Sequence, residues 1–301
     1  MIGLALSVYL ELHVTVAPAS SPTYLNCSIS YDGSGSENIS LVPDRNIITQ
    51  AALYVLRCHN RHEFPLQTHI HIVNPIPLGR GLGSSGAAVV AGIILGNEVG
   101  NFGMSKERIL DFCLMIERHP DNVAAALYGG FVGTYLNELN EVDMARKEIP
   151  LSEVLPAPAG GMDTGKTPPL PPLNIGHYIK FRWAPEINAI AIIPDFEVST
   201  AKARDALPKE YKRADVVFNL QRVPLLTYAL GQSPPQPSLI FEAMQDKMHQ
   251  PYRQTLIPGL KEVLESVTSV SHPGLLGICL SGAGPTVRAM KCFSPSDRSK
   301  R

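Results

Sequence analysis

The stretch PLGRGLGSSGAA, at residues 77–88, is a glycine-rich segment between two regions of different periodicity. Residues 68–73 before it alternate between apolar and polar side chains, which predicts a β-strand. Residues 84–98 are mostly Ala, Gly and aliphatic residues and predict a helix. A glycine-rich loop between a strand and a helix is a common phosphate site, because the N–H groups and the dipole at a helix start attract an anion.

The loop carries the residue types that such a site needs. Gly79, Gly81 and Gly83 allow positive φ and a close approach of the backbone to a ligand. Ser84 and Ser85 then place hydroxyl groups at the start of the helix. These features predict a polyphosphate site, and a glycine-rich turn with a serine N-cap is the alternative. The loop is not a dinucleotide-binding fingerprint, because Ser84 stands where that motif has its third glycine.

Strands and helices alternate over the rest of the chain, which indicates an α+β protein. The spacing of apolar residues predicts an amphipathic helix at residues 46–58 and another at residues 106–117, with Ser105 as the N-cap of the second. The other expected elements are strands at residues 4–16, 131–136, 187–193 and 275–280, and a helix at residues 199–207 that Ser199 caps.

A Pro- and Gly-rich insertion is expected at residues 155–173, followed by a boundary between two domains, residues 1–180 and 181–301. The insertion contains GGMDTGKT at residues 160–167, which matches the G-x-x-x-x-G-K-[ST] phosphate loop letter for letter. That motif functions only between a strand and a helix, and prolines on both sides prevent a helix here. We therefore interpret this match as a flexible loop.

Composition excludes several classes of function. The 301 residues are 45% hydrophobic and 18% charged with a formal net charge of −1, values typical of a soluble globular protein and not of a nucleic-acid-binding one. No apolar run reaches the roughly 18 residues of a membrane helix. The five cysteines are scattered and no basic leader is evident, so a cytoplasmic location is expected. His69 and His71 share a strand face without an evident third ligand, and we interpret them as structural.

Several blocks resemble the GHMP small-molecule kinases, a family named after galactose, homoserine, mevalonate and phosphomevalonate. Residues 77–88 are similar to the family's P-x-x-x-G-L-G-S-S-A loop, with Gly86 in place of Ala. ERHPDNVAAALYGG at residues 117–130 resembles the H-x-D-N-V-A signature of the homoserine kinases in that family. STAKARDALP at 199–208 and QPYRQTLIP at 250–258 also resemble homoserine kinase blocks, and LSGAGPT at 280–286 resembles the C-terminal Gly-rich loop of the GHMP family. The Pro-rich insertion and several blocks resemble the fungal homoserine kinases.

The resemblance implies a two-domain GHMP kinase fold, with an N-terminal domain like ribosomal protein S5 and a ferredoxin-like C-terminal domain. It implies that ATP and Mg²⁺ are used to phosphorylate the hydroxyl of L-homoserine in threonine biosynthesis. A homodimer is left open, and no nucleic-acid or membrane partner is expected. Family members have a further loop before the first block and a helix and strand after the last one. We therefore expect a chain truncated at both ends that expresses poorly and turns over slowly.

This resemblance assigns nucleotide binding to the glycine-rich loop at residues 77–85 and to the start of the helix at residues 46–58. The residues are Asn46, Pro77, Gly79, Arg80, Gly81, Leu82, Gly83, Ser84 and Ser85. Ser85 and Asp111 are expected to hold Mg²⁺, and Glu117 is the alternative carboxylate. An exposed carboxylate on a helix surface is the other interpretation of Asp111.

Substrate binding is assigned by the same resemblance to residues spread over the later blocks. His119 and Asp121 would hold the amino acid group of homoserine. Arg204 and Arg253 would grip its carboxylate, with Arg204 alternatively on the γ-phosphate, because a guanidinium offers a planar bidentate fork. Further substrate contacts are expected from Thr200, Gly282 and Gly284.

Asn122 stands where mevalonate kinases have a catalytic Asp. An amide cannot act as a general base, so the resemblance implies a hydroxyl that attacks through alignment and charge neutralisation. The catalytic residues are then expected to be Ser85, Asp111, Asn122 and Arg204. A GHMP kinase with a mevalonate-type substrate and a catalytically impaired paralogue are the alternatives.

Overall fold

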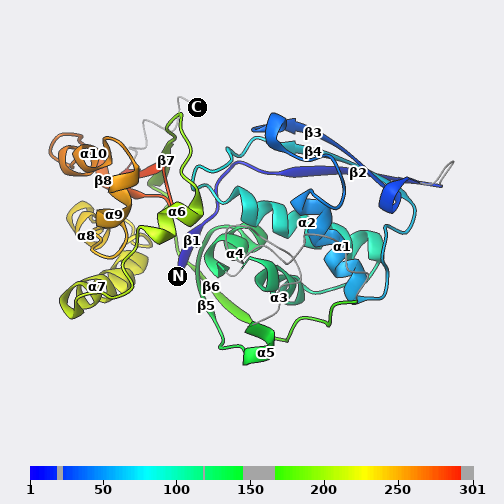
Figure 1. Cartoon of the computed structure of the whole chain (residues 1–301). Helices are drawn as coiled ribbons and strands as arrows, with labels where there is room; N and C mark the ends of the chain where they lie inside the picture. Colours follow the sequence, from blue (N-terminus) through cyan, green and yellow to red (C-terminus); the bar gives the residue numbers. More distant parts are fainter. Residues whose placement is uncertain (19–22, 118, 145–166, 293–301) are drawn as a thin grey trace. The chain divides into compact units, whose positions relative to one another are not determined.

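The computed structural model describes residues 1–18, 23–117, 119–144 and 167–292. It forms two compact units (Figure 1). The first comprises Met1–Leu78 and Gly83–Lys180, and the second comprises Gly79–Leu82 and Phe181–Arg301. The tip of the glycine-rich loop therefore belongs to the second unit, whereas the helix after the loop belongs to the first.

One sheet of the first unit supplies the strand before the glycine-rich loop. Its order is β2 (Glu11–Ala17), β4 (Gln67–Asn74) and β3 (Cys27–Gly33). β2 is antiparallel to β4, and β3 is parallel to it. The strand expected at residues 68–73 is thus confirmed as β4, whose alternate residues Ile70 and Ile72 are fully buried.

A second sheet of this unit has the order β1 (Ile2–Leu4), β5 (Phe131–Leu136) and β6 (Gly176–Phe181). β1 is antiparallel to β5. The prediction of one continuous strand at residues 4–16 is wrong, because residues 5–10 are in no strand and the chain passes through them from this sheet to the other. The crossing residues are mostly apolar, with only Ser7 between them, so the sequence pattern gave no sign of the break.

Helices form the core of the first unit. They are α1 (Ile47–Cys58), α2 (Ser84–Gly100), α3 (Lys106–Ile116), α4 (Pro120–Tyr128) and the short α5 (Glu141–Met144). Residues of α1 such as Leu53 pack with Ile70 under the β2-β4-β3 sheet, and α1 and α2 also share a second buried cluster with α3 and α4 (Figure 1). The three helices expected here are confirmed as α1, α2 and α3.

Glycines explain why α2 can lie so close to α1. A Cβ on Gly92 would lie 2.3 Å from the carbonyl oxygen of Ile48, and one on Gly96 would lie 2.7 Å from that of Ala52. Both glycines lie one turn apart on the face of α2 that meets α1. The small residues of α2 therefore let the two helix backbones pack closely together.

The second unit is built on one antiparallel sheet with the order β7 (Ile187–Ile192), β9 (Val287–Cys292) and β8 (Leu275–Leu280). Its helices are α6 (Thr200–Asp205), α7 (Arg213–Ala229), α8 (Pro237–Ala243), α9 (Gln250–Arg253) and α10 (Leu260–Ser266). Among the described residues, short 3-10 helices span Tyr24–Asn26, Ser36–Asn38 and Gln254–Leu256.

The expected strands β5, β7 and β8 and the helix α6 are present, and Ser199 caps α6 by accepting from the N–H of Lys202 at 3.2 Å. The sequence pattern missed α7, which is mostly exposed and contains Pro224. In the part of the chain that the structure describes, every helix is too short or too polar to span a bilayer. Residues 160–166 of the rejected phosphate-loop match lie outside the described residues.

Candidate active site

The glycine-rich loop delivers two serines to the start of α2, as expected. Gly83 has a φ of +78°, and Ser84 and Ser85 form the first turn of the helix. The Oγ of Ser85 donates to Oε2 of Glu117 at 3.2 Å. Glu117 follows α3 directly and is only 4% exposed. A hydroxyl and a buried carboxylate therefore meet at the helix N-terminus.

Glu117 also joins this helix start to the H-x-D-N block. Its Oε1 lies 2.7 Å from Nδ1 of His119, which precedes α4 as its N-cap residue. Pro120 occupies the first position of α4, where its fixed φ suits a helix start. The two oxygens of one buried carboxylate are thus shared between Ser85 and His119, an arrangement that fixes the orientation of the carboxylate.

Asp121 and Asn122 lie in the first turn of α4. Oδ1 of Asp121 is buried and has no hydrogen-bond partner among the described residues. Burial raises the pKa of Asp121, although a backbone hydrogen bond and the charge of His119 oppose the rise. A buried carboxylate oxygen without a partner is costly, and it suits a ligand that carries N–H groups or a positive charge.

Asn122 lies against the first turn of α2. A Cβ on Gly86 would lie 3.2 Å from the Cβ of Asn122, and one on Gly83 would lie 3.5 Å from its Oδ1. Gly86, where the related motif has Ala, therefore gives Asn122 room. The side chain is exposed, and its amide is directed at the loop that the sequence assigns to phosphate.

In the second unit, the tip of the glycine-rich loop is bound to the C-terminal loop at residues 281–284. The Oγ of Ser281 donates to the carbonyl oxygen of Gly81 at 2.7 Å, and the N–H of Thr286 donates to that of Arg80 at 3.3 Å. A Cβ on Gly81 would lie 2.4 Å from the carbonyl oxygen of Ser281. The two glycine-rich loops are thus in backbone contact, which only glycine permits at this position.

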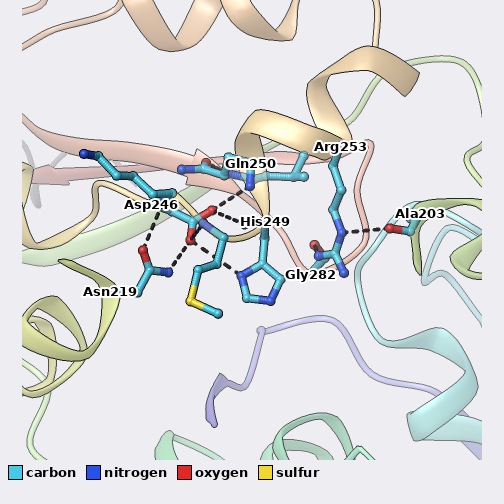
Figure 2. Close-up of polar contacts among 10 residues, drawn as sticks. Ala203, Asn219, Asp246, His249, Gln250, Arg253 and Gly282 are labelled. Carbon is cyan, nitrogen blue, oxygen red and sulfur yellow. Dashed lines mark hydrogen bonds and ion pairs between the residues drawn. The ribbon is translucent and has the colours of Figure 1, made fainter. Parts of the chain in front are cut away.

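Arg253 connects this C-terminal loop to α6. Its Nη1 donates to the carbonyl oxygen of Gly282 at 2.7 Å, and its Nε donates to that of Ala203 at 3.2 Å (Figure 2). Burial lowers the pKa of Arg253, and the positive charge of nearby Arg204 adds to this effect against the opposing charge of Asp246. Two guanidinium groups close together favour an anionic ligand between or beside them.

Comparisons with known proteins agree with this geometry. Residues 46–130 match the family model for the GHMP kinases N terminal domain. The chain is 57% identical to the homoserine kinase of Saccharomyces cerevisiae, over 96% of this chain and 83% of that one. The chain belongs to the homoserine kinase family. It is also 50% identical to the homoserine kinase of Candida albicans, over 95% of this chain and 82% of that one.

A solved structure shows the same fold. The crystal structure of the homoserine kinase from Cytophaga hutchinsonii superimposes with a TM-score of 0.68 and 25% identity, covering 96% of this chain and 78% of that one. The expected family and the α+β GHMP kinase fold are therefore confirmed. The homoserine kinase blocks that the sequence suggested lie at the start of α2, at the start of α4, in α6, in α9 and in the loop after β8.

Asp111, the residue expected to share Mg²⁺ with Ser85, has other partners. Its Oδ1 accepts from the N–H of Ile175 at 2.8 Å. Its Oδ2 accepts from the N–H of Asn174 at 3.2 Å and pairs with Arg108 at 3.1 Å. It is not the exposed helix carboxylate of the alternative interpretation either, because it is 4% exposed. Asp111 joins α3 to the start of β6, and the structure brings Ser85 to Glu117 instead.

Asn46, expected on the adenine side, is buried as the N-cap of α1. Its Oδ1 accepts from the N–H of Ile48 at 3.0 Å, and its Nδ2 donates to the carbonyl oxygen of Ser40 at 2.9 Å. Both ends of the amide are therefore used to hold the helix start. A role for Asn46 toward adenine stays a prediction.

The remaining predicted residues lie in the two loops and in α6. Arg80 donates to the carbonyl oxygen of Pro194 and lies 4.0 Å from Asp195, so the loop tip is attached to the segment after β7. Pro77 and Leu82 are partly exposed in the same loop, and Thr200 is the first residue of α6. Gly284 has a φ of +88° and its N–H donates to the carbonyl oxygen of Ser281 at 2.9 Å, which closes the C-terminal loop.

Two residues that sequence reasoning missed support this loop. Gln250 accepts from the N–H of Leu280 at 2.7 Å through its Oε1, and Asp246 accepts from the N–H of Gln250 at 2.6 Å. Asp side chains often accept from backbone N–H groups two residues further on and so hold a turn, a local preference that could have suggested Asp246. The contact between Gln250 and Leu280 spans 30 residues, and no local pattern indicates it.

Proposed function

We propose that this chain transfers the γ-phosphoryl group of ATP to the side-chain hydroxyl of L-homoserine and releases O-phospho-L-homoserine. The observation that carries this proposal is Glu117, which contacts both Ser85 of the phosphate loop and His119 of the homoserine kinase signature. Phosphoryl transfer requires positioning and charge neutralisation more than covalent chemistry by the protein. A carboxylate that joins the nucleotide block to the substrate block suits that requirement.

Ser85 and Glu117 fit Mg²⁺ better than Ser85 and Asp111 do. The Oγ of Ser85 and the Oε2 of Glu117 are 3.2 Å apart, close to the roughly 3 Å between neighbouring ligands of an octahedral ion with bonds of 2.0–2.1 Å. Within the described residues, no cluster of three or more His, Cys, Asp or Glu side chains could hold a metal. Few protein ligands are what Mg²⁺ commonly has when phosphate oxygens and water complete its shell. Bound there, Mg²⁺ would neutralise charge on the transferred phosphoryl group.

His119 would orient Glu117 and contact the substrate amino acid group, together with Asp121. The unpartnered Oδ1 of Asp121 suits the ammonium group of homoserine, because an N⁺–H donor would satisfy a buried acceptor. Arg253 and Arg204 suit the substrate carboxylate, since a guanidinium binds a carboxylate in a planar, bidentate way. These roles account for an amino acid alcohol as the acceptor.

The reaction proceeds without a strong protein base at Asn122. An amide neither accepts a proton usefully nor carries charge. Its place against the first turn of α2 allows it to orient the hydroxyl or a phosphate oxygen by hydrogen bonds. Alignment of the reacting atoms then supplies much of the rate acceleration.

A coupled assay of ADP release with L-homoserine, mevalonate and galactose tests this function. We expect turnover that requires L-homoserine and Mg²⁺, with mevalonate and galactose at background. Turnover with mevalonate and none with L-homoserine would replace the proposal by another GHMP kinase activity. Binding of L-homoserine without ADP release would indicate an impaired paralogue.

The proposed reaction also suggests a cellular compartment and the partners of the chain. The five cysteines are free thiols, as a reducing compartment such as the cytoplasm would keep them. L-Homoserine and ATP are small soluble molecules, so no macromolecular partner is needed for turnover. A homodimer stays a prediction, which sedimentation of the purified chain would test.

A further inference from the structure

The helix that carries Arg253 is too short to hold its own position. α9 spans only Gln250–Arg253, and an isolated helix of one turn is unstable because nucleation is costly. Yet both of its end residues make defined contacts with the C-terminal loop. Gln250 accepts from the N–H of Leu280 at 2.7 Å, and Arg253 donates to the carbonyl oxygen of Gly282 at 2.7 Å. Another group must therefore fix α9.

That group is the carboxylate of Asp246 (Figure 2). Its Oδ2 accepts from the N–H groups of His249 at 2.8 Å and Gln250 at 2.6 Å, and its Oδ1 accepts from the N–H of Met248 at 3.1 Å. Three backbone N–H groups at the start of α9 thus donate to one carboxylate. Asp246 satisfies these donors as an N-cap side chain does, although it lies three residues before the N-cap position. The side chain of Asp246 is 16% exposed.

The surroundings of Asp246 keep it charged. Burial would raise its pKa, but hydrogen bonds from His249, Gln250 and Asn219 outweigh that effect and hold the pKa well below its usual range. A charged acceptor makes stronger hydrogen bonds with N–H groups than a neutral one. The turn at residues 246–250 is therefore held by an ionised carboxylate at neutral pH.

Asn219 attaches this turn to α7. Its Nδ2 donates to Oδ1 of Asp246, and its Oδ1 accepts from the N–H of Lys247 at 2.9 Å (Figure 2). α7 is 17 residues long and can hold one side chain in place. A continuous set of hydrogen bonds thus runs from α7 through Asp246 to α9, and from α9 to the loop at residues 280–282.

We propose that Asp246 is a positioning residue that fixes the direction of the Arg253 guanidinium toward the carboxylate of the amino acid substrate. This inference rests on the proposed function, in which Arg253 binds that carboxylate. The contacts of Asp246 are with Asn219 and with residues 248–250. Asp246 acts through Arg253 and, by way of Gln250, through the loop that begins at Ser281.

Single substitutions separate this role from general stabilisation. Asp246→Ala removes all the acceptors, and Asp246→Asn keeps one oxygen and the size of the side chain. We expect kcat/KM for L-homoserine to fall by up to about a hundredfold in Asp246→Ala and by less in Asp246→Asn, because a small misplacement of a binding group has effects of that size. The loss should lie in the KM for L-homoserine, with the KM for ATP changed by less than about twofold.

The matched control is Asp215→Asn. Asp215 lies in the first turn of α7 and its Oδ1 is 3.9 Å from Nζ of Lys247, so it is a neighbouring carboxylate of the same kind. It accepts no hydrogen bond from α9, and its kinetics should stay close to those of the unmodified chain. If Asp246→Ala does not yield folded protein, the comparison of Asp246→Asn with Asp215→Asn carries the same test.

Combining Asp246→Asn with Arg253→Lys decides the inference. If Asp246 acts through Arg253, the double variant should have the same KM for L-homoserine as Arg253→Lys alone, because coupled residues are non-additive. Independent, multiplying effects on KM would overturn the inference while leaving the proposed function intact. Equal rises in both KM values would also overturn it. An unchanged KM for L-homoserine in Arg253→Lys alone would overturn the role of Arg253 and the inference with it.

Discussion

Glu117 in the first unit and Asp246 in the second are carboxylates beside the start of a helix, and they are held in different ways. Glu117 is buried, whereas the side chain of Asp246 is 16% exposed. Glu117 accepts from two side chains, Ser85 and His119. Asp246 accepts from three backbone N–H groups and from Asn219. Side-chain donors can turn away when a ligand arrives, whereas backbone donors in a helix start cannot. The first carboxylate is therefore able to exchange partners for a ligand, and the second is part of the framework.

The largest loss of activity is expected from substitution of Glu117. Glu117→Gln keeps the shape but removes the charge that a metal and a helix start require, so kcat should fall by about 10²–10³-fold, as when a key transition-state contact is removed. The melting temperature should change by only a few degrees. Steady-state kinetics and calorimetry on the same preparation measure both quantities.

Asp111 is also a buried carboxylate, but its substitution by Asn should affect stability and not kcat. Asp111 accepts from the N–H groups of Asn174 and Ile175 and pairs with Arg108, so its loss should lower stability by about 1–3 kcal/mol. Its kcat should remain near that of the unmodified chain at a temperature where the variant is folded. A kcat loss in Asp111→Asn that matches Glu117→Gln would restore Asp111 as the magnesium ligand.

A second large effect is expected where the two glycine-rich loops touch. Gly81→Ala adds a Cβ only 2.4 Å from the carbonyl oxygen of Ser281 in a backbone of φ +72°, so the loops must separate. We expect kcat/KM to fall roughly a hundredfold, because the loop then moves by a distance that matters for alignment.

Gly103→Ala is the control for this substitution. Gly103 has a φ of +63°, and no described residue lies within 4 Å of its Cβ position, so only the backbone strain remains. That strain is about 1–2 kcal/mol, and kcat/KM should not change. Equal losses of activity in the two variants would show that the contact between the loops has no role.

The start of α2 and the H-x-D-N block can both be found from the sequence, but by different routes. The start of α2 was predicted because strand, loop, serines and helix are consecutive, and each has a local pattern. The H-x-D-N block was found through its resemblance to homoserine kinases. Asp111 was preferred over Glu117 for Mg²⁺ because sequence spacing cannot show which carboxylate faces Ser85, and that depends on how α3 ends.

The framework of the second unit was mostly not predictable. Asn219, Asp246, Gln250 and Gly282 are separated by up to several tens of residues, and their contacts depend on tertiary packing. α7 was missed because its exposed surface and Pro224 hide a helical period. The break between β1 and β2 was missed because residues 5–10 between them are mostly apolar and contain no Gly or Pro.

Substitution of Arg253 in the second unit should change the KM for the substrate by a moderate amount. Arg253→Lys keeps the positive charge but loses the planar guanidinium, whose Nη1 donates to Gly282 and whose Nε donates to Ala203. It also loses the fork that would bind a carboxylate. We expect the KM for L-homoserine to rise about tenfold, with that for ATP nearly unchanged. An equal rise in both would place Arg253 outside the amino acid site.

The smallest effect is expected at Asp121 and concerns stability. Because burial raises its pKa in the folded state, the folded protein binds more protons than the unfolded chain between the ordinary Asp pKa and the raised one, and stability falls as pH rises through that window. Asp121→Asn should remove this loss and raise the melting temperature at pH 7, by about 2–4 °C for each kcal/mol gained. Thermal unfolding of both proteins from pH 4 to 8 measures this difference in melting temperature. A lower melting temperature for Asp121→Asn than for the unmodified chain at pH 7 would contradict the claim that the Asp121 carboxylate is uncompensated.

The most direct test of the central claim, that Ser85 and Glu117 hold Mg²⁺ at the start of α2, is a change of metal preference. Ser85→Cys replaces a hard oxygen ligand by a soft sulfur, which binds Mg²⁺ poorly and softer divalent ions such as Cd²⁺ well. We predict that Ser85→Cys loses homoserine-dependent ADP release with Mg²⁺ and regains part of it with Cd²⁺, while Ser84→Cys shows no such rescue. Full activity of Ser85→Cys with Mg²⁺, or equal rescue of both variants, would contradict the account.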